Sequence, residues 1–453
     1  MTVSVVLFTS DLRLHDHPPL HAAVATADEV VPLFVRDRGI EAAGFAAPNR
    51  LAFLADCLAD LDAGLRARGG RLVVREGDVV KEVCALAHQV GAGEVHVAAG
   101  VSAYARRREE RLGEELASIG ARLRVHDGVV TVVPPGAVVP AGRDHFAVFT
   151  PYFRRWSHER PREPLPAPRR LRVPDTAEPG RPVDRADVPG TSPGLARGGE
   201  TEGRGRSAAW LRKDAEAYAE RHDDLAGDAT SRLSPHLHFG TLSALELTYR
   251  ARESGASGAE AFVRQLCWRD FHHQVLAARP AASWTDYRPR GDRWRTGPDA
   301  DAAIDAWKQG LTGFPVVDAA LRQLAHEGWM HNRARLITAS FLAKTLYIDW
   351  RVGARHFLDL LVDGDMADNQ LNWQWVAGTG TDTRPNRVLN PIAQSRRHDP
   401  DGTYIRRWLP ELAGVAGSAV HEPWKLPDGD RPAYPAPIVE LSDATRRFRR
   451  ARG

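Results

Sequence analysis

Cysteine is scarce in this chain of 453 residues, and its three copies follow no pattern. Cys57, Cys84 and Cys267 lie far apart, and none belongs to a C-x-x-C pair. This spacing predicts neither a disulfide framework nor a cysteine-bound zinc ion. We therefore expect a reducing, cytoplasmic setting.

Long apolar runs are also missing. The first run, residues 3–8, follows no basic segment and is too short for a signal peptide. No later stretch approaches the roughly 18 apolar residues of a membrane span, so we expect no membrane partner. Hydrophobic residues make up 43% and charged residues 26%, which is typical of a soluble globular chain. The formal charge of +3 neither favours nor excludes nucleic acid, because binding needs a local patch.

Motifs for phosphate and metal binding are absent or incomplete. No G-x-G-x-x-G follows the first apolar run, and no phosphate-loop motif occurs. Asp363 and Asp365 could begin a calcium loop, but Ala367 stands where the third ligand is needed. His272 and His273 would point to different faces of a helix and lack a third ligand. We therefore predict no metal site.

What the first 128 residues do contain is an alternation of apolar, β-branched runs with helical patterns. In residues 50–61, for example, apolar residues recur three and four positions apart. Short buried strands separated by helices predict a doubly wound parallel α/β sheet, whose ligands usually lie beyond the carboxyl ends of the strands. The expected strands are residues 3–8, 30–35, 72–74, 94–98 and 122–126.

Composition changes after this region. Pro, Gly, Arg and Glu dominate residues 160–206, as expected of a linker. From Ser207 onward the pattern is helical, with expected helices near residues 315–324, 333–346 and 353–362. Pro315 can occupy the first turn of the first of these helices, and Gly328 suits its end. The predicted class is α/β plus all-α, with a sheet domain at 1–128, a linker at 129–206, a helical domain at 207–445 and a tail at 446–453.

The predicted tail carries five arginines, at positions 446, 447, 449, 450 and 452. Such runs are typical of solvated, disordered ends, and a nonspecific phosphate contact is the alternative.

Tryptophan is abundant in the helical region, since 11 of the 12 tryptophans follow residue 200. The same region contains hydroxyls at residues 230–234 that can cap a helix or cradle a phosphate. Arg335 lies beside a strongly apolar helix flank, where a buried arginine needs a partner. Together with the carboxylates and amides of residues 363–375, these features suit a pocket for a planar, anionic cofactor.

At these residues the sequence resembles the DNA photolyase/cryptochrome family, and most closely its class I cyclobutane pyrimidine dimer (CPD) photolyases. The resemblance covers nearly the whole chain. The motifs that carry it are T-S-R-L-S-P, W-R-D-F, T-G-F-P-V-V-D-A-A-L-R-Q-L, G-W-M-H-N-R-A-R, D-W-R-x-G, D-G-D-x-A-x-N and W-Q-W-V-A-G-T-G-T-D.

The resemblance implies that the helical domain binds FAD and works with its reduced anion. It matches Asp363 to the partner of Arg335, Asp365 to a contact of the flavin edge, and Asn369 to the residue that faces flavin N5. The full implied FAD set is Tyr218, Thr230, Ser231, Arg232, Leu233, Ser234, Phe262, Gln265, Arg269, Asn332, Arg335, Asp363, Asp365 and Asn369.

The resemblance also implies light-driven repair of pyrimidine dimers in UV-damaged DNA, single- or double-stranded, by a monomer. An extruded dimer would receive an electron from excited reduced FAD. Trp268 and Trp375 match the aromatic walls of the lesion pocket, and Arg333 matches a contact to the lesion phosphate. The implied catalytic residues are Gln265, Asn332, Asn369, Trp268 and Trp375, and the implied electron-transfer chain is Trp373, Trp350 and Trp294.

A light-harvesting chromophore is implied for the sheet domain. Residues 45–54, which include Arg50, are more similar to family members that bind 8-hydroxy-5-deazaflavin than to those that bind methenyltetrahydrofolate. Arg50 is therefore the expected antenna contact.

Three positions depart from the CPD pattern, and they keep other functions open. Gln265 replaces a glutamate that bonds the lesion bases, Leu336 replaces a methionine, and Phe262 replaces a tryptophan. A (6-4) photolyase is one alternative, although Asn332 stands where those enzymes carry histidine. A cryptochrome-like light receptor without repair is another. A plain nucleotide-binding α/β module is the third, and it leaves the tryptophan-rich region unexplained.

Overall fold

The computed structural model describes residues 1–180 and 183–452, and it divides the chain into two compact units. The first unit contains Met1–Thr191, Ala196–Glu216 and Ser231–Pro280. The second contains Ser192–Leu195, Ala217–Thr230 and the chain from Ala281 onward. Because the chain passes between the units several times, each unit is built from segments far apart in sequence.

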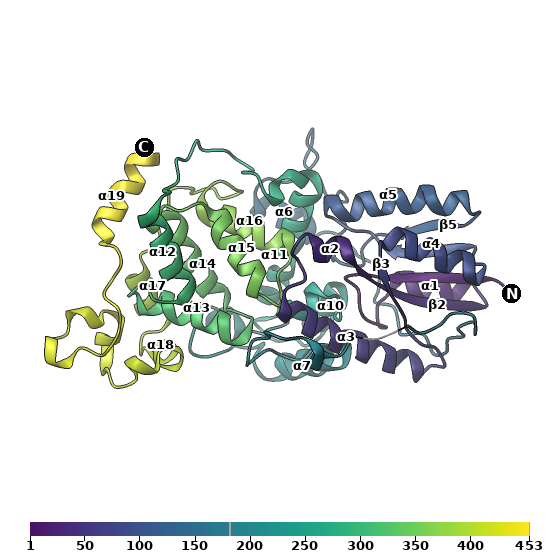
Figure 1. Cartoon of the computed structure of the whole chain (residues 1–453), viewed down its shortest axis with the longest axis horizontal. Helices are drawn as coiled ribbons and strands as arrows, with labels where there is room; N and C mark the ends of the chain where they lie inside the picture. The colour runs from purple at the N-terminus through teal and green to yellow at the C-terminus, as the bar shows by residue number, and fades with distance from the viewer. Residues whose placement is uncertain (181–182, 453) are drawn as a thin grey trace. The chain divides into compact units, whose positions relative to one another are not determined.

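The first unit is organised around a five-stranded sheet (Figure 1). All neighbouring strands are parallel, and the strand order is β3-β2-β1-β4-β5. Val5 of β1 pairs with Val31 of β2 on one side and with Val95 of β4 on the other. The predicted parallel sheet is confirmed. The strands are β1 (Val3–Phe8), β2 (Glu29–Asp37), β3 (Val73–Gly77), β4 (Glu94–Ala98) and β5 (Arg122–His126).

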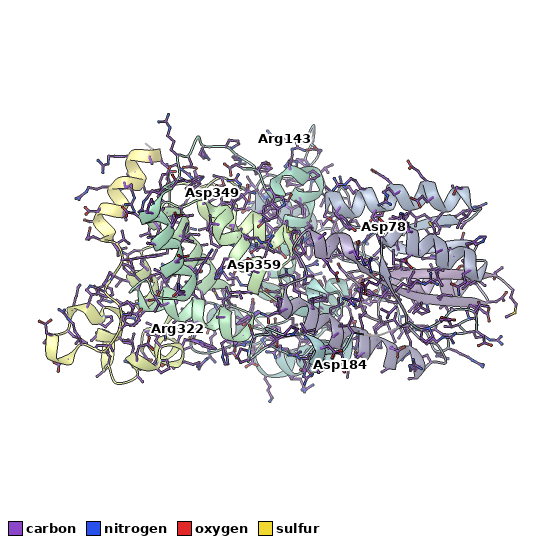
Figure 2. All side chains as sticks on the ribbon, viewed as in Figure 1. Asp78, Arg143, Asp184, Arg322, Asp349 and Asp359 are labelled. Atoms are coloured by element: carbon purple, nitrogen blue, oxygen red, sulfur yellow. The ribbon has the colours of Figure 1, made fainter. Side chains whose placement is uncertain are left out.

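Helices α4 (Val79–Val90) and α5 (Ala103–Ser118) pack on this sheet through aliphatic side chains. Val83 of α4 and Leu112 of α5 share one core with the strand residues Val5 and Val95. Asp78, labelled in Figure 2, accepts a hydrogen bond from the backbone of Lys81 and so begins α4. The other helices of this unit are α1 (Pro18–Thr26), α2 (Arg38–Ala42), α3 (Pro48–Arg66), α6 (Phe149–Trp156), η1 (Arg185–Asp187), α7 (Glu200–Lys213), α9 (Ser234–His238), α10 (Ala244–Glu253) and α11 (Ala259–Ala278).

The second unit is helical, and no strand occurs among its described residues. Its core joins apolar side chains of α13, α14, α15 and α16. The helices are α8 (Tyr218–Arg221), α12 (Pro298–Gln309), α13 (Pro315–Glu327), α14 (Asn332–Ser340), η3 (Phe341–Leu346), α15 (Trp350–Leu360), α16 (Met366–Ala377), α17 (Pro391–His398), α18 (Thr403–Trp408), α19 (Leu441–Arg452) and the short turns η4 (Pro410–Leu412), η5 (Gly417–His421), η6 (Pro423–Lys425) and η7 (Asp428–Asp430). The turn η2 (Pro280–Ser283) lies where the chain enters this unit.

The boundaries follow from local chemistry. As predicted, α13 begins at Pro315 and ends before Gly328, whose φ of +62° favours glycine. Asp349, labelled in Figure 2, accepts from the Arg351 backbone and starts α15 earlier than predicted. The single helix predicted at 333–346 is wrong in detail, because α14 gives way to a π-helical turn at Phe341 that stops at Tyr347, where φ is +57°.

The arginine-rich end also corrects an expectation. It is helix α19 rather than a disordered tail, and its Phe448 is only 1% exposed. Arg452 forms an ion pair with Asp292 at 2.6 Å, and both side chains are buried. None of the described helices is both long enough and apolar enough to cross a membrane.

Candidate functional site

Arg335 and Asp363 form an ion pair in the second unit. The guanidinium Nη2 donates to both carboxylate oxygens of Asp363, at 2.7 and 3.0 Å, and Nε donates to the Met330 carbonyl at 2.8 Å. Asp363 is 3% exposed and Arg335 is 24% exposed. The arginine therefore neutralises a buried carboxylate while its own side chain remains partly exposed.

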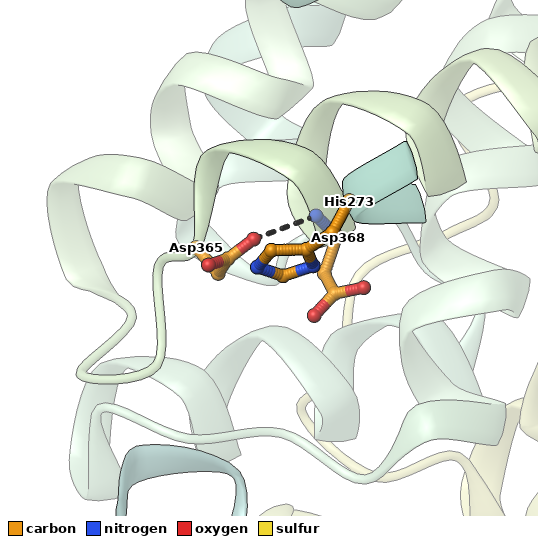
Figure 3. Close-up of side chains that lie close together, drawn as sticks. All are labelled: His273, Asp365 and Asp368. Atoms are coloured by element: carbon orange, nitrogen blue, oxygen red, sulfur yellow. Dashed lines mark hydrogen bonds between the residues drawn. The ribbon is translucent and has the colours of Figure 1, made fainter. Parts of the chain in front are cut away.

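Two further predicted residues begin α16. Asp365 is the N-cap of this helix and accepts from the backbone of Asp368 at 2.9 Å, as the dashed line in Figure 3 shows. One turn later, the Asn369 amide nitrogen donates to Ala354 at 3.1 Å and to Gln370 Oε1 at 2.9 Å. Both bonds use the nitrogen, so they fix which way the amide of this buried residue points.

Three other predicted FAD contacts of this unit differ in burial: Tyr218 and Thr230 on the phosphate side, and Asn332 on the flavin side. Tyr218 is buried at the start of α8, and burial raises the pKa of its phenol. The Thr230 hydroxyl is buried and has no hydrogen-bond partner in the described part of the chain. Asn332 is exposed at the first position of α14.

Arg333 contacts an acidic residue rather than standing alone. Its Nε and Nη2 donate to the two carboxylate oxygens of Asp223, at 3.2 and 2.5 Å. Burial acts to raise the pKa of Asp223, but the bonds from Arg333 outweigh it and hold this pKa below the usual value. A phosphate that binds Arg333 therefore has to compete with a carboxylate.

The predicted electron-transfer tryptophans differ in exposure. Trp373 and Trp350 are 2% and 0% exposed, whereas Trp294 is half-buried. The Trp373 ring packs edge-on against Phe357, with centroids 5.0 Å apart, and against Trp307, with centroids 6.1 Å apart. Trp373 Nε1 has no partner among the described residues.

The Trp350 indole is held between two charged side chains. Its Nε1 donates to Asp286 Oδ1 at 2.9 Å, and the Arg351 guanidinium lies 4.7 Å from its ring centroid. Trp294 contacts the ring of Tyr347, with centroids 5.0 Å apart.

Trp375, a predicted wall of the lesion pocket, carries a cation on its ring. The Arg387 guanidinium lies 5.2 Å from the Trp375 centroid. The segment that carries Arg387 is held by buried Lys344, whose amine donates to the carbonyls of Pro385 and Arg387 at 2.8 and 2.7 Å.

In the first unit, the remaining predicted lesion and flavin residues lie on α11. Gln265, Trp268 and Arg269 are three and four positions apart, which places them on one helix face. Gln265 is exposed, and Arg269 is buried and donates to the carbonyls of Val130 and Leu237 at 2.6 and 3.3 Å.

Aromatic stacking fixes the rings on this helix. Trp268 is parallel to Phe149, with centroids 3.6 Å apart, so one face of its ring is covered within the unit. Phe262 is buried and contacts Trp210, with centroids 4.7 Å apart.

The hydroxyl-rich segment also belongs mainly to the first unit. Leu233 rather than a hydroxyl residue is the N-cap of α9, whose first residue is Ser234. Arg232 has a left-handed backbone with φ of +52°, and the Ser231 carbonyl accepts from Arg206 at 3.0 Å. The antenna candidate Arg50 is buried on α3 and donates twice to the Phe45 carbonyl, at 3.0 and 2.7 Å.

Several neighbours of the predicted residues were not themselves predicted from the sequence. Asp223 and Asp286 lie 110 and 64 positions from the side chains they contact, so no local spacing could indicate them. Arg387 and Tyr347 belong to no motif, and only the folded chain reveals their contacts with Trp375 and Trp294.

The second unit has the donor and acceptor types that a flavin requires. A buried carboxylate paired with a partly exposed guanidinium can satisfy polar ring edges and offset negative charge. The unpartnered hydroxyl of Thr230 is a buried polar atom that a ligand oxygen could satisfy. The residues present therefore fit a flavin nucleotide.

Comparison with known proteins agrees with this assignment. Residues 4–169 match the DNA photolyase family, and residues 262–452 match the FAD binding domain of DNA photolyase. A Streptomyces griseus protein named deoxyribodipyrimidine photo-lyase is 67% identical over 456 residues, with 100% of both chains covered.

Two solved structures share the fold. An archaeal photolyase from Sulfolobus tokodaii, solved with two FAD molecules, has a TM-score of 0.87 at 30% identity and covers 99% of both chains. A cryptochrome from Synechocystis sp. PCC6803 has a TM-score of 0.91 at 28% identity and covers 100% of this chain and 99% of its own. A parallel α/β unit combined with a helical FAD-binding region defines this class of flavoprotein. The chain belongs to the DNA photolyase/cryptochrome family.

Proposed function

We propose that this protein is a deoxyribodipyrimidine photo-lyase, which uses blue light to split cyclobutane pyrimidine dimers in DNA. The observation that carries the proposal is the full-length identity of 67% to the Streptomyces griseus protein of that name. The Arg335–Asp363 ion pair supports it, because it supplies a buried carboxylate and its counter-ion within the FAD-binding region.

FAD would be held by the residues that the family resemblance implies. Those toward its ring would be Arg335, Asp363, Asp365 and Asn369. Those toward its phosphates would be Tyr218 and Thr230 to Ser234. When bound and reduced, FAD supplies the light-excited electron that splits the dimer and takes the electron back afterwards. Arg335 offsets the charge of Asp363, so a reduced flavin anion would not face an uncompensated carboxylate there.

The Asn369 amide is held by Ala354 and Gln370 and orients its oxygen without a charge. An amide cannot release a proton at neutral pH. Asn369 would therefore not protonate the reduced flavin beside it, and the flavin would remain an anion.

DNA binding would depend on extrusion of the lesion. A damaged pair stacks poorly and is the least costly to flip out of the duplex. Trp268 and Trp375 would then stack on the extruded pyrimidines, which contributes about 1–3 kcal/mol per base. Gln265 would donate to or accept from the base edges, and Arg333 would contact the lesion phosphate.

For the sheet unit we propose a second, light-harvesting chromophore, 8-hydroxy-5-deazaflavin, with Arg50 among its contacts. The two hydrogen bonds that Arg50 donates to the Phe45 carbonyl support this, because they hold the loop before α3 in place. Chromatography of the chromophores released from purified protein tests it. A folate or a second FAD in the released fraction would replace the deazaflavin.

The decisive experiment is blue-light repair of a defined thymine dimer in single- and double-stranded oligonucleotides, with absorption spectra of the same preparation. We expect bound FAD and restored thymines only in the light. A matched variant, Arg335→Gln, should lose FAD and repair together, whereas Arg322→Gln, a half-buried arginine on α13 paired with Glu411, should keep both. Bound flavin without dimer splitting would favour a light receptor, and splitting of only the (6-4) lesion would assign the other repair activity.

A further inference from the structure

Tyr347 and Trp294 form an aromatic pair in the second unit. Their ring centroids are 5.0 Å apart and their planes are inclined at 45°. The Arg295 backbone N–H donates to the Tyr347 carbonyl at 2.9 Å, and Arg295 Nη1 donates to the Leu346 carbonyl at 3.0 Å. These bonds hold the two rings in fixed contact. Tyr347 is 3% exposed, whereas Trp294 is half-buried, so the tyrosine is the more protected ring.

The phenol of Tyr347 faces a carboxylate. Its hydroxyl donates to Asp292 Oδ1 at 2.9 Å. Asp292 is itself fixed by Arg452 at the end of α19, through bonds of 2.6 Å to each carboxylate oxygen. Burial, followed by the bond to Asp292, raises the pKa of Tyr347, so the phenol is neutral and its proton points at a base.

The backbone at Tyr347 is a second, independent observation. Its φ of +57° places a bulky residue in the left-handed region, which is a genuine outlier for such a side chain. Strained backbone of this kind persists only where the surroundings impose it, and it clusters at functional sites. Here the left-handed residue ends the π-helical segment, and its ring contacts Trp294.

We propose that Tyr347 donates an electron to Trp294 after Trp294 has been oxidised. The inference rests on the proposed function, in which Trp373, Trp350 and Trp294 carry an electron to photo-excited, oxidised flavin. One electron passes from the phenol to the oxidised indole, which returns to neutral Trp294. The phenolic O–H bond breaks and its proton passes to Asp292 Oδ1, so the products are a neutral tyrosyl radical and a protonated Asp292.

Transfer of the phenolic proton to Asp292 determines how long the charge-separated state lasts. An oxidised phenol is a strong acid, so a carboxylate in hydrogen-bond contact takes its proton even though Arg452 also binds that carboxylate. Return of the electron then requires return of the proton, which lengthens the life of the charge-separated state. Arg452 is a positioning residue in this scheme, because it holds Asp292 toward Tyr347.

The test is electron paramagnetic resonance of the FAD-containing protein, frozen under blue light and prepared with either ordinary or ring-deuterated tyrosine. We expect a tyrosyl component whose lines narrow on deuteration. Tyr347→Phe should lose that component and leave only a tryptophan radical, and its charge-separated state should recombine sooner than the tyrosyl state of the wild type. Tyr404→Phe is the matched control, because Tyr404 is a buried tyrosine of the same unit whose hydroxyl is also bonded, to Gln323 at 2.7 Å. It should behave as the wild type.

Proton transfer is tested by transient absorption in H₂O and D₂O. For the wild type, the decay of oxidised Trp294 should be slower in D₂O than in H₂O, whereas Tyr347→Phe should show no such difference. In Asp292→Asn the decay of oxidised Trp294 should also be slower than in the wild type, because an amide is a poor base. A wild type that forms only a tryptophan radical, with a lifetime unchanged in Tyr347→Phe, would overturn the inference. A wild type with bound flavin and no light-induced radical would overturn the tryptophan chain as well, and repair by chemically reduced protein would show separately whether the proposed function stands.

Discussion

Arg333 and Asp223 are joined by two hydrogen bonds, of 3.2 and 2.5 Å, although 110 positions separate them in the sequence. Both side chains are only partly exposed, at 22% and 28%. Arg333 is the residue proposed to bind the lesion phosphate, so its carboxylate partner occupies the donors that the phosphate needs. We therefore expect Asp223 to hold the arginine in place and to lower its affinity for DNA.

Removal of this competition is expected to strengthen DNA binding. In Asp223→Asn, Arg333 keeps a neighbouring acceptor but loses the neutralising charge, so affinity for a dimer-containing duplex should rise several-fold at low salt. One additional phosphate contact steepens the plot of log affinity against log salt by about 0.9. Fluorescence anisotropy at several salt concentrations measures both quantities. Arg333→Gln is the matched control and should shift both in the opposite direction, and an unchanged salt slope in Asp223→Asn would contradict this role.

Restoring a carboxylate at position 265 should improve repair. Gln265 is exposed on α11 and carries hydrogen-bonding groups but no charge. A charged hydrogen bond contributes about 1 kcal/mol more than a neutral one, so Gln265→Glu should raise the yield of dimer splitting several-fold without changing bound FAD. The measurement is thymine restored per absorbed photon, with the flavin spectrum of the same sample as the control. A yield in Gln265→Glu equal to or below that of the wild type would contradict the hypothesis that the uncharged glutamine slows repair.

The sequence predicted the elements well where a local signal defines them. Strands β1, β4 and β5 have the predicted limits, and α13 follows its proline and glycine signals. The π-helical turn before Tyr347 could not be predicted, because packing rather than residue spacing determines where α14 loosens. The motifs likewise named Arg333 and Trp294 but not Asp223 or Tyr347, since those contacts form only between distant segments. The composition of residues 446–452 is that of a disordered tail, but the segment is helical. Its helix is held by the buried side chain of Phe448 and by the ion pair between Arg452 and Asp292, neither of which local composition indicates.

The tryptophan chain is expected to serve photoreduction and not repair. In Trp373→Phe, oxidised flavin should remain oxidised under blue light with an external thiol, because phenylalanine is far harder to oxidise than tryptophan. The same variant, reduced chemically with dithionite, should repair dimers at the wild-type rate. Trp307→Phe is the matched control, because Trp307 is a fully buried tryptophan packed against Trp373 but outside the chain. Normal photoreduction in Trp373→Phe would mean that the chain is assigned to the wrong residues.

Close packing at Trp373 predicts a steric effect on stability. A Cβ added to Gly353 would lie 2.1 Å from Cη2 of Trp373, whose ring is only 2% exposed. Overpacking of this kind costs about 1–3 kcal/mol, so Gly353→Ala should lower the free energy of unfolding by at least that amount. Gly205→Ala is the control, because its Cβ would meet nothing within 4 Å on α7, and it should stabilise by about 0.5–1 kcal/mol. Urea unfolding measures the free energy of unfolding of both variants and of the wild type. If Gly353→Ala were as stable as the wild type, the Trp373 ring would have to move aside.

Lys344 predicts a pH dependence of stability. Burial lowers the pKa of its amine from 10.5 to about 7, even though Asp382 acts to raise it. Between these values the unfolded chain binds a proton that the folded chain does not, so the free energy of unfolding should rise with pH, by at most about 1.4 kcal/mol per pH unit from this group. Lys344→Met should flatten that rise in urea unfolding at pH 7.5, 8.5 and 9.5, whereas exposed Lys308→Met should retain it. If the slope of Lys344→Met equals that of the wild type, the amine is charged in the folded protein throughout this range, and its bonds to Pro385 and Arg387 are those of an ammonium group.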